Sequence, residues 1–159
     1  LLGVLKGAMM VMADLSRLLR HDSVEIDWIT VSSYGDETTS SGVIKLLKAP
    51  DLDLAGRNVL IVDDITDSGL TLSWLLDHLR SLDAASVEVF SLLRKPELAR
   101  VEVPVRFLGF DIPPVFIVGY GMDYAQRYRN LPYIATMIEQ PFAAPEHPRR
   151  RTNGRAVGT

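Results

Sequence analysis

Short apolar runs alternate along this chain with segments whose apolar residues recur at helical spacing. Residues 59–62, VLIV, form one such run, and five leucines from Leu72 to Leu82 then mark one face of a helix. Residues 1–5 form another apolar run, which a helical pattern over 8–20 follows. Strands that alternate with helices join through right-handed crossovers into a parallel sheet with helices on both faces. The pattern therefore predicts an α/β fold whose ligands bind where the strands end.

The remaining predicted strands are rich in β-branched, aromatic or other apolar residues. A polar stretch between two of them, SYGDETTSSG at 33–42, contains two glycines and no periodicity, which predicts a long mobile loop. Lys6-Gly7, Asp63-Asp64 and Lys95 directly follow predicted strands, so we expect them at one edge of the sheet. The other strands are expected at residues 24–32, 43–47, 86–93, 105–110, 116–120 and 133–138.

The composition excludes several classes of protein. At 159 residues with 47% apolar residues, the chain fits one domain with a sizeable core. It has no cysteine, which excludes disulfides and thiolate chemistry and suits a reducing cytoplasm. No apolar run approaches the roughly 18–20 residues that span a bilayer, so we expect no membrane insertion. The three histidines show no metal-ligand spacing.

Charge is distributed unevenly along the chain. Residues 141–159 carry four arginines against one glutamate, which leaves residues 1–140 with a net charge of −6. So acidic a body is a poor general binder of nucleic acid, and we expect no nucleic-acid partner. We therefore predict a folded domain over 1–140 and a disordered basic tail over 141–159. The first residue, Leu1, already belongs to an apparent strand, so we expect that a natural N-terminal segment is missing.

Three carboxylates stand where the strand at 59–62 gives way to a helix, in the segment VLIVDDITDSGLT. Like charges this close repel each other, and an unpaired buried charge is costly. An acidic helix cap would explain one carboxylate and not three, and no GxxxxGK[ST] loop accompanies them. The amides and hydroxyls of Asp67 to Thr71 form an anion site at the start of the predicted helix. The combination suits a ribose 5-phosphate, whose hydroxyls would donate to Asp63 and Asp64.

VLIVDDITDSGLT resembles the thirteen-residue phosphoribosyl pyrophosphate signature of type I phosphoribosyltransferases. Other segments resemble one branch, the hypoxanthine-guanine phosphoribosyltransferases. Leu5-Lys6-Gly7 is similar to their pyrophosphate loop, Ser33-Tyr34 to their flexible catalytic loop, and Lys95 to their purine-selecting lysine. Residues 116–134 are similar to their C-terminal purine and pyrophosphate segment. The resemblance spans roughly residues 1–138 and implies a mainly parallel twisted sheet, flanked by helices, with a small C-terminal hood.

The resemblance also implies the binding residues. Lys95, Phe116, Ile117 and Asp123 would bind the purine, hypoxanthine or guanine. A cis peptide bond between Leu5 and Lys6 would turn backbone amides toward pyrophosphate. The phosphoribosyl and pyrophosphate groups would be bound by Lys6, Gly7, Asp63, Asp64, Asp67, Ser68, Gly69, Thr71 and Arg129.

A magnesium-dependent transfer is the implied reaction. Asp63 and Asp64, with Asp123 at a second ion, would bind Mg²⁺, which in proteins commonly takes one or two carboxylates plus substrate phosphates. Asp67 would be the proton acceptor. Ser33 and Tyr34 would belong to a lid that shields a reactive sugar cation from water. The products would be IMP or GMP, and the family relationship implies a homo-oligomer, a dimer or a tetramer.

Each assignment has an ordinary alternative. Lys95 could be a surface lysine, Phe116 a core aromatic residue, and Tyr34 simply an exposed side chain. Asp123 and Arg129 could be a helix-end cap and a solvated arginine. Two other functions also remain open: a transferase that prefers xanthine or a pyrimidine, and a non-catalytic regulator that keeps the site for sensing.

Overall fold

The computed structural model describes residues 1–34 and 43–138, with only the backbone of Ser33, Tyr34 and Val43. The elements are β1 (Leu2–Leu5), α1 (Met9–Leu18), β2 (Asp27–Tyr34), β3 (Val43–Lys48), β4 (Asn58–Thr66), α2 (Leu70–Arg80), β5 (Ser86–Arg94), the 3₁₀ turn η1 (Pro96–Leu98), β6 (Phe107–Asp111), β7 (Ile117–Val118) and β8 (Ala135–Thr136). The loop expected over 33–42 starts later than predicted, because the backbones of Ser33 and Tyr34 pair with β3 and belong to β2. The rest of that loop and the tail expected over 141–159 lie outside the described residues.

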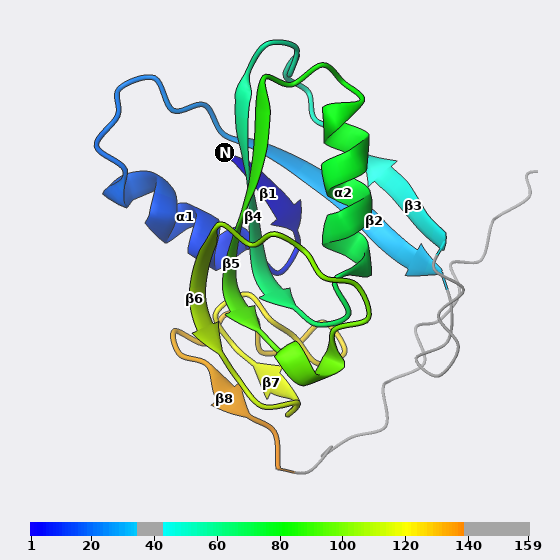
Figure 1. Cartoon of the computed structure of the whole chain (residues 1–159). Coiled ribbons are helices and arrows are strands. Elements are labelled where there is room, and N and C mark those ends of the chain that lie inside the picture. The colour runs from blue at the N-terminus through cyan, green and yellow to red at the C-terminus, as the bar shows by residue number, and fades with distance from the viewer. Residues whose placement is uncertain (35–42, 139–159) are drawn as a thin grey trace, which may run out of the picture.

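Six of the described strands form one twisted sheet in the order β3-β2-β1-β4-β5-β6 (Figure 1). Neighbouring strands are parallel except β2 and β3, which run antiparallel at one edge. Helix α1 connects β1 to β2, and helix α2 connects β4 to β5. The predicted α/β fold with a mainly parallel sheet is therefore confirmed.

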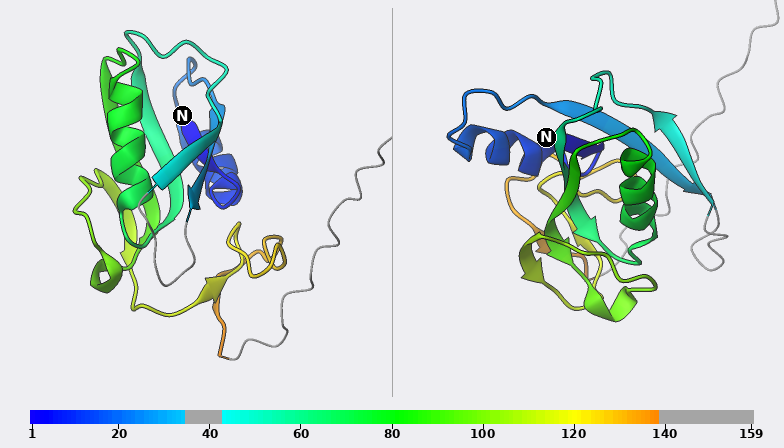
Figure 2. Two further views of the ribbon diagram at one scale, coloured as in Figure 1. Left: turned by 90° about the vertical axis from the view of Figure 1, so that its right-hand side faces the viewer. Right: turned by 45° about the horizontal axis from the view of Figure 1, so that its top comes forward.

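The two helices cover opposite faces of the sheet (Figure 2). Helix α2 buries four of the five predicted leucines against one face, while Leu82 lies beyond the helix end and is 39% exposed. On the other face, Val11 and Met12 of α1 pack against Val62. Since Ile61 packs on the α2 side, β4 is buried on both faces, which explains its unbroken apolar run. No helix in the described part of the chain is long and apolar enough to cross a membrane.

A small hood lies beyond the carboxyl ends of β4 and β5 (Figures 1 and 2). It contains the antiparallel pair β7 and β8, and Ile117 and Met122 pack with Leu93 of the main sheet. The Tyr120 hydroxyl donates a hydrogen bond to Asp14 on α1. Burial, together with this bond, raises the pKa of Tyr120 to about 12, so its hydroxyl stays a donor at physiological pH. The predicted C-terminal hood is thus present and tied to both the sheet and α1.

Strand β4 runs further than its apolar pattern predicted. It continues to Thr66, so Asp63 and Asp64 lie within the strand and not after it. The reason is the neighbour β5, which pairs with β4 from Asn58–Ser86 to Thr66–Arg94 and keeps these backbone groups in the sheet. The sequence pattern ended at Val62 because the next side chains are polar. The two carboxyl groups are therefore held by a sheet and not by a loop.

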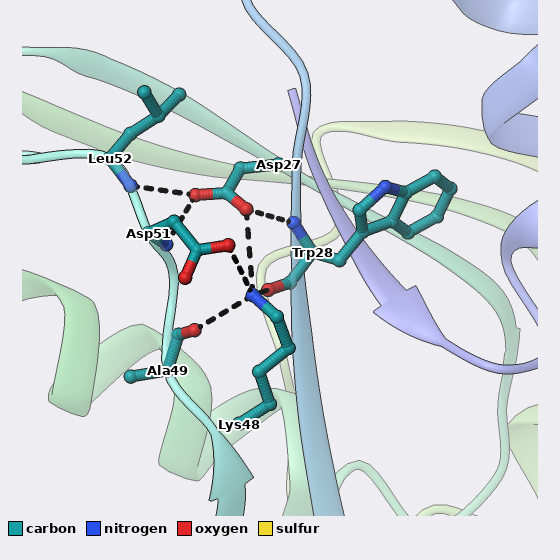
Figure 3. A network of polar contacts seen from close by, with 6 residues as sticks. All are labelled: Asp27, Trp28, Lys48, Ala49, Asp51 and Leu52. Atoms are coloured by element: carbon teal, nitrogen blue, oxygen red, sulfur yellow. Dashed lines mark hydrogen bonds and ion pairs between the residues drawn. The ribbon is translucent and has the colours of Figure 1, made fainter.

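At the start of β2, Asp27 fixes the connection that follows β3 (Figure 3). Its carboxylate accepts hydrogen bonds from the backbone N–H groups of Trp28 and Asp51, both at 2.7 Å, and of Leu52 at 2.9 Å. The Lys48 ammonium lies 3.8 Å away. Burial raises the pKa of Asp27, but these donors outweigh it and hold the pKa below its usual value. This network is structural, since it lies at the sheet edge opposite the strands' carboxyl ends.

Candidate active site

A cleft of about 320 Å³ is lined by the carboxyl ends of β1, β4 and β5 and by the hood. The cleft therefore lies at the edge of the sheet where the sequence predicted the ligand site. Its lining includes nine of the predicted site residues: Lys6, Gly7, Asp64, Asp67, Lys95, Phe116, Ile117, Asp123 and Arg129.

The Lys6-Gly7 loop is packed tightly between β4 and the hood. The Leu5–Lys6 peptide bond is cis, as the resemblance implied. A Cβ atom added at Gly7 would overlap the Asp64 carboxylate, and one added at Gly121 of the hood would overlap the Gly7 carbonyl oxygen. This close approach leaves no room for a side chain at position 7.

Asp63 and Asp64 are neighbouring carboxyl groups: Asp63 is buried and lies outside the lining of the cleft, whereas Asp64 is half-buried and lines it. Asp63 is 8% exposed, and burial together with the charge of Asp64 raises its pKa well above the usual value. Burial also raises the pKa of Asp64 to about 6, although Arg129 and backbone N–H groups oppose the shift. Neither residue takes part in an ion pair within residues 1–34 and 43–138. The pair therefore has the electrostatics of a site that a positive ligand would stabilise.

A divalent cation fits this donor set. Mg²⁺ prefers oxygen ligands and usually keeps waters and substrate phosphates beside one or two carboxylates. The part of the chain that the structure describes contains no group of three acidic, histidine or cysteine side chains that could hold a metal. Asp63 and Asp64 therefore suit an ion that the substrate helps to bind. Asp123 forms an ion pair with Arg129, and its role at a second ion stays a prediction.

Asp67 and Lys95 form an ion pair at the side of the cleft. The Lys95 ammonium lies 3.2 Å from Oδ1 and 3.4 Å from Oδ2 of Asp67. Only 9% of the lysine side chain is exposed, against 47% of the aspartate. The backbone N–H of Lys95 donates to the Thr66 carbonyl at 2.9 Å, which fixes the lysine beside β4. Lys95 is therefore not a surface lysine, and Asp67 pairs with it instead of capping α2.

Ser68, Gly69 and Thr71 lie at the start of α2, outside the lining of the cleft. Gly69 is the cap residue, with φ of 79°, and the first N–H of the helix, at Leu70, donates a long hydrogen bond of 3.4 Å to the Ser68 hydroxyl. The N-terminus of the helix can still meet an anion, because so long a bond is weak and the dipole favours negative charge there. The backbone N–H groups of Arg100 and Val101 donate to the Ser68 carbonyl at 3.0 and 3.1 Å. The segment that contains Arg100 and Val101 therefore packs against the turn before α2, a contact that no sequence pattern indicated.

The aromatic side of the cleft is formed by the hood. Phe116 is 45% exposed, and its ring meets the Tyr124 ring edge-on with centroids 5.8 Å apart. Ile117 is buried in β7. Phe116 is thus not a core residue, and it offers an apolar surface beside Lys95.

Asp123 and Arg129 face each other across a tight loop. Their side chains lie 2.6 Å apart and are 23% and 19% exposed, respectively. Arg129 also donates through Nη1 to the Gly121 carbonyl at 2.7 Å, while its buried Nε has no partner in the described residues. The residues between them form turns and no helix, so the helix-end alternative is wrong.

Some residues lie outside this arrangement, and others were missed. The backbones of Ser33 and Tyr34 pair with β3 at the end of β2, and their catalytic role stays a prediction. Sequence reasoning did not find Tyr120, Gly121 or Gln126. Gly121 could have been suspected from the GYG triplet, but Tyr120 and Gln126 depend on contacts more than a hundred positions away.

Known proteins give the same family as the motifs. The phosphoribosyl transferase domain matches residues 1–125. The hypoxanthine-guanine phosphoribosyltransferase of Mycobacterium tuberculosis is 50% identical over 137 residues, which cover 86% of this chain and 67% of that protein. That of Bacillus subtilis is 48% identical over 136 residues, covering 86% and 75%. A crystal structure of a hypoxanthine-guanine phosphoribosyltransferase from Bacillus anthracis has a TM-score of 0.81 and 47% identity, and covers 86% of this chain and 80% of that one. The chain therefore belongs to the phosphoribosyltransferase family, in its hypoxanthine-guanine branch.

Proposed function

We propose that this protein transfers the phosphoribosyl group of phosphoribosyl pyrophosphate to hypoxanthine or guanine, giving IMP or GMP and pyrophosphate. One observation carries the proposal. A single cleft joins two cations, Lys6 and Arg129, to a half-buried carboxylate, Asp64, and to a lysine and an exposed aromatic ring. These features match a pyrophosphate, a ribose and an oxo-purine in the order in which the two substrates carry them.

The charges divide the cleft into subsites. Lys6 and Arg129 would bind the pyrophosphate oxygens, since an ammonium and a guanidinium both donate charge-assisted hydrogen bonds. Asp63 and Asp64 would accept from the ribose hydroxyls. The start of α2 at Ser68, with Gly69 and Thr71, would bind the 5-phosphate through its amides and hydroxyls.

Lys95 would select the base. An ammonium group has three donors and no acceptor, so it can bond a 6-oxo group but not the 6-amino group of adenine. Phe116 would pack against the purine ring, and backbone groups of Ile117 would meet its edge. Asp123 also lines the cleft and would lie near the purine 2-position.

The reaction is a displacement at the anomeric carbon. Purine nitrogen 9 forms the new bond to this carbon, the bond to the pyrophosphate oxygen breaks, and its electron pair leaves with pyrophosphate. The Asp67 carboxylate accepts the proton from nitrogen 7, so the purine does not retain a positive charge. Asp63 and Asp64 would hold magnesium, which would supply positive charge to balance the leaving pyrophosphate. Ser33 and Tyr34 would exclude water from the reacting carbon.

Initial rates of the full chain test the proposal. With phosphoribosyl pyrophosphate and magnesium, hypoxanthine and guanine should give nucleotide, while adenine and uracil should give little. Xanthine turnover at an equal kcat/KM would support the broader purine alternative. Binding of phosphoribosyl pyrophosphate without turnover of any base would support the regulator instead. Asp67→Asn provides the matched inactive control.

We further propose that the protein is a cytoplasmic homo-oligomer. The cysteine-free composition suits a reducing compartment. Edge strand β6 carries Phe107 and Phe110, which are 46% and 64% exposed and point to opposite faces of the sheet, so a second copy packed along this edge would cover apolar side chains. The molar mass from light scattering checks the assembly, and a monomer at micromolar concentration would contradict it.

A further inference from the structure

Gln126 lies at the tip of a two-residue hairpin turn in the hood. Tyr124 and Arg127 exchange backbone hydrogen bonds of 3.2 and 2.9 Å, and the two residues between them, Ala125 and Gln126, have φ of 50° and 65°. Positive φ at both central positions is the geometry of a type I′ turn, which strongly favours Asn-Gly. Ala125 and Gln126 are not glycines, so their positive φ angles strain the backbone of this turn. Such strain persists only where contacts with the surrounding structure stabilise the conformation.

The Gln126 carboxamide oxygen lies between the two cations of the cleft. It accepts a hydrogen bond from the Lys6 ammonium at 3.1 Å and another from Nη2 of Arg129 at 3.4 Å. The backbone N–H of Gln126 donates to the Asp123 carboxylate at 2.7 Å, which fixes the turn. The side chain itself is exposed to solvent, so its burial cannot explain why the strained turn keeps it.

We propose that Gln126 is a positioning residue for the pyrophosphate group: its carboxamide oxygen holds the Lys6 ammonium and the Arg129 guanidinium together. The inference rests on the proposed function, because it assigns pyrophosphate to these two cations. It adds a residue to which the sequence motifs gave no role.

The remaining donors show why the bridge assists binding and does not compete with it. The Lys6 ammonium gives one of its three donors to Gln126 and keeps two for a ligand. Arg129 uses Nη2 for Asp123 and Gln126 and one hydrogen of Nη1 for the Gly121 carbonyl, which leaves the second hydrogen of Nη1 for a ligand, since Nε is buried. The Gln126 amide oxygen is neutral, so it holds the two like charges near each other without cancelling them. It also orders the Lys6 side chain before the ligand binds, which reduces the conformational entropy that this side chain would otherwise lose on binding.

Two substitutions separate this role from folding. Gln126→Gly removes the side chain and suits the positive φ, so the thermal midpoint should not fall below that of the parent. Gln126→Leu keeps much of the volume but has no acceptor. Asn130→Ala is the matched control, because it removes an exposed amide from the same loop. The probe is inorganic pyrophosphate with magnesium chloride, titrated calorimetrically into each full-length variant, so that the result does not depend on turnover.

Both Gln126 variants should raise the pyrophosphate Kd by about 2- to 10-fold. This is the effect expected when one long side chain, that of Lys6, is no longer ordered before the ligand binds. Asn130→Ala should leave the Kd unchanged, and KM for the purine should change less than twofold in every variant. In a Lys6→Ala background, Gln126→Gly should have a clearly smaller effect, because one of its two partners is gone. A Kd equal to that of the parent, or the same fold-change with and without Lys6, would overturn the inference. A parent that binds pyrophosphate but turns over no base would refute the proposed function alone.

Discussion

Replacing Lys95 should change both the choice of base and the chemical step, because the lysine pairs with Asp67 in addition to its proposed contact with the purine. Its ammonium is buried and lies 3.2 Å from the Asp67 carboxylate. Lys95→Met keeps the length of the apolar stem and removes only the charge. The variant therefore removes a donor to the 6-oxo group and, at the same time, the partner that orients the proposed base.

The two losses differ in size and in the substrates that they affect. A hydrogen bond to a charged group contributes about 1.5–3 kcal/mol, or about 12- to 150-fold in kcat/KM, for hypoxanthine and guanine only. The ion pair is discounted because almost half of the Asp67 side chain is exposed. Such a pair contributes at most about 1 kcal/mol, or roughly fivefold, and this loss reaches every base, adenine included.

Initial rates of Lys95→Met with hypoxanthine, guanine and adenine measure both effects in one experiment. The ratio of hypoxanthine to adenine kcat/KM should fall by the larger factor, and the adenine rate should fall by the smaller one. An equal fall for all three bases would refute the selection role, and an unchanged adenine rate would refute the orienting role. Circular dichroism of the variant checks that the fold is retained.

Three other substitutions test separate parts of the structure. Asp67→Asn should lower kcat by about 10²- to 10⁴-fold with little effect on the Kd of phosphoribosyl pyrophosphate, since Asn cannot take a proton; a kcat within threefold of the parent would contradict the assignment. Gly7→Ala should raise the KM of phosphoribosyl pyrophosphate and destabilise the fold by about 1–3 kcal/mol, because the added Cβ overlaps the Asp64 carboxylate; urea unfolding measures the second effect. Asp27→Ala should destabilise the fold by about 1–3 kcal/mol at pH 7, because three backbone donors lose their acceptor.

The Asp27 effect should also depend on pH. Its pKa in the folded protein lies below the unfolded value, so its contribution is fully present above about pH 4. It is lost as the pH falls through the folded pKa. The difference in unfolding free energy between the parent and Asp27→Ala should therefore shrink in acid. A constant difference from pH 7 to pH 3 would show that the carboxylate's ionisation does not matter to the network.

The sequence predicted the parallel sheet and most of the cleft because both follow from local patterns. A strand buried on both faces must be apolar, as residues 59–62 are, and a helix that covers a sheet must repeat its leucines on one face. Parallel strands bring their carboxyl ends together, so Lys6, Asp64 and Lys95 had to meet. The length of β4 was underestimated because backbone pairing with β5, and not side-chain pattern, decides where it ends.

Contacts between distant segments were beyond the sequence pattern. Gln126 meets Lys6 although the two residues are 120 positions apart, and nothing in the local sequence of either residue encodes their approach. The Lys95–Asp67 ion pair was missed for a related reason. Each residue was assigned to a different substrate atom, and only the register of β4 and β5 shows that their side chains lie next to each other.

The docking of the hood connects the fold to the chemistry. Lys6 comes from β1 and Arg129 from the hood, so the two cations face one ligand only while the hood is in place. Besides the packing of Ile117 and Met122 on Leu93, the hood is held by the Tyr120 hydrogen bond to Asp14 and approaches the Gly7 carbonyl closely at Gly121. The close approach at Gly121 joins the hood directly to the pyrophosphate loop. Because that loop also packs on Asp64, the hood, the loop and β4 are in direct contact. We therefore expect binding at one end of the cleft to affect binding at the other, through this packing and not through a flexible linker.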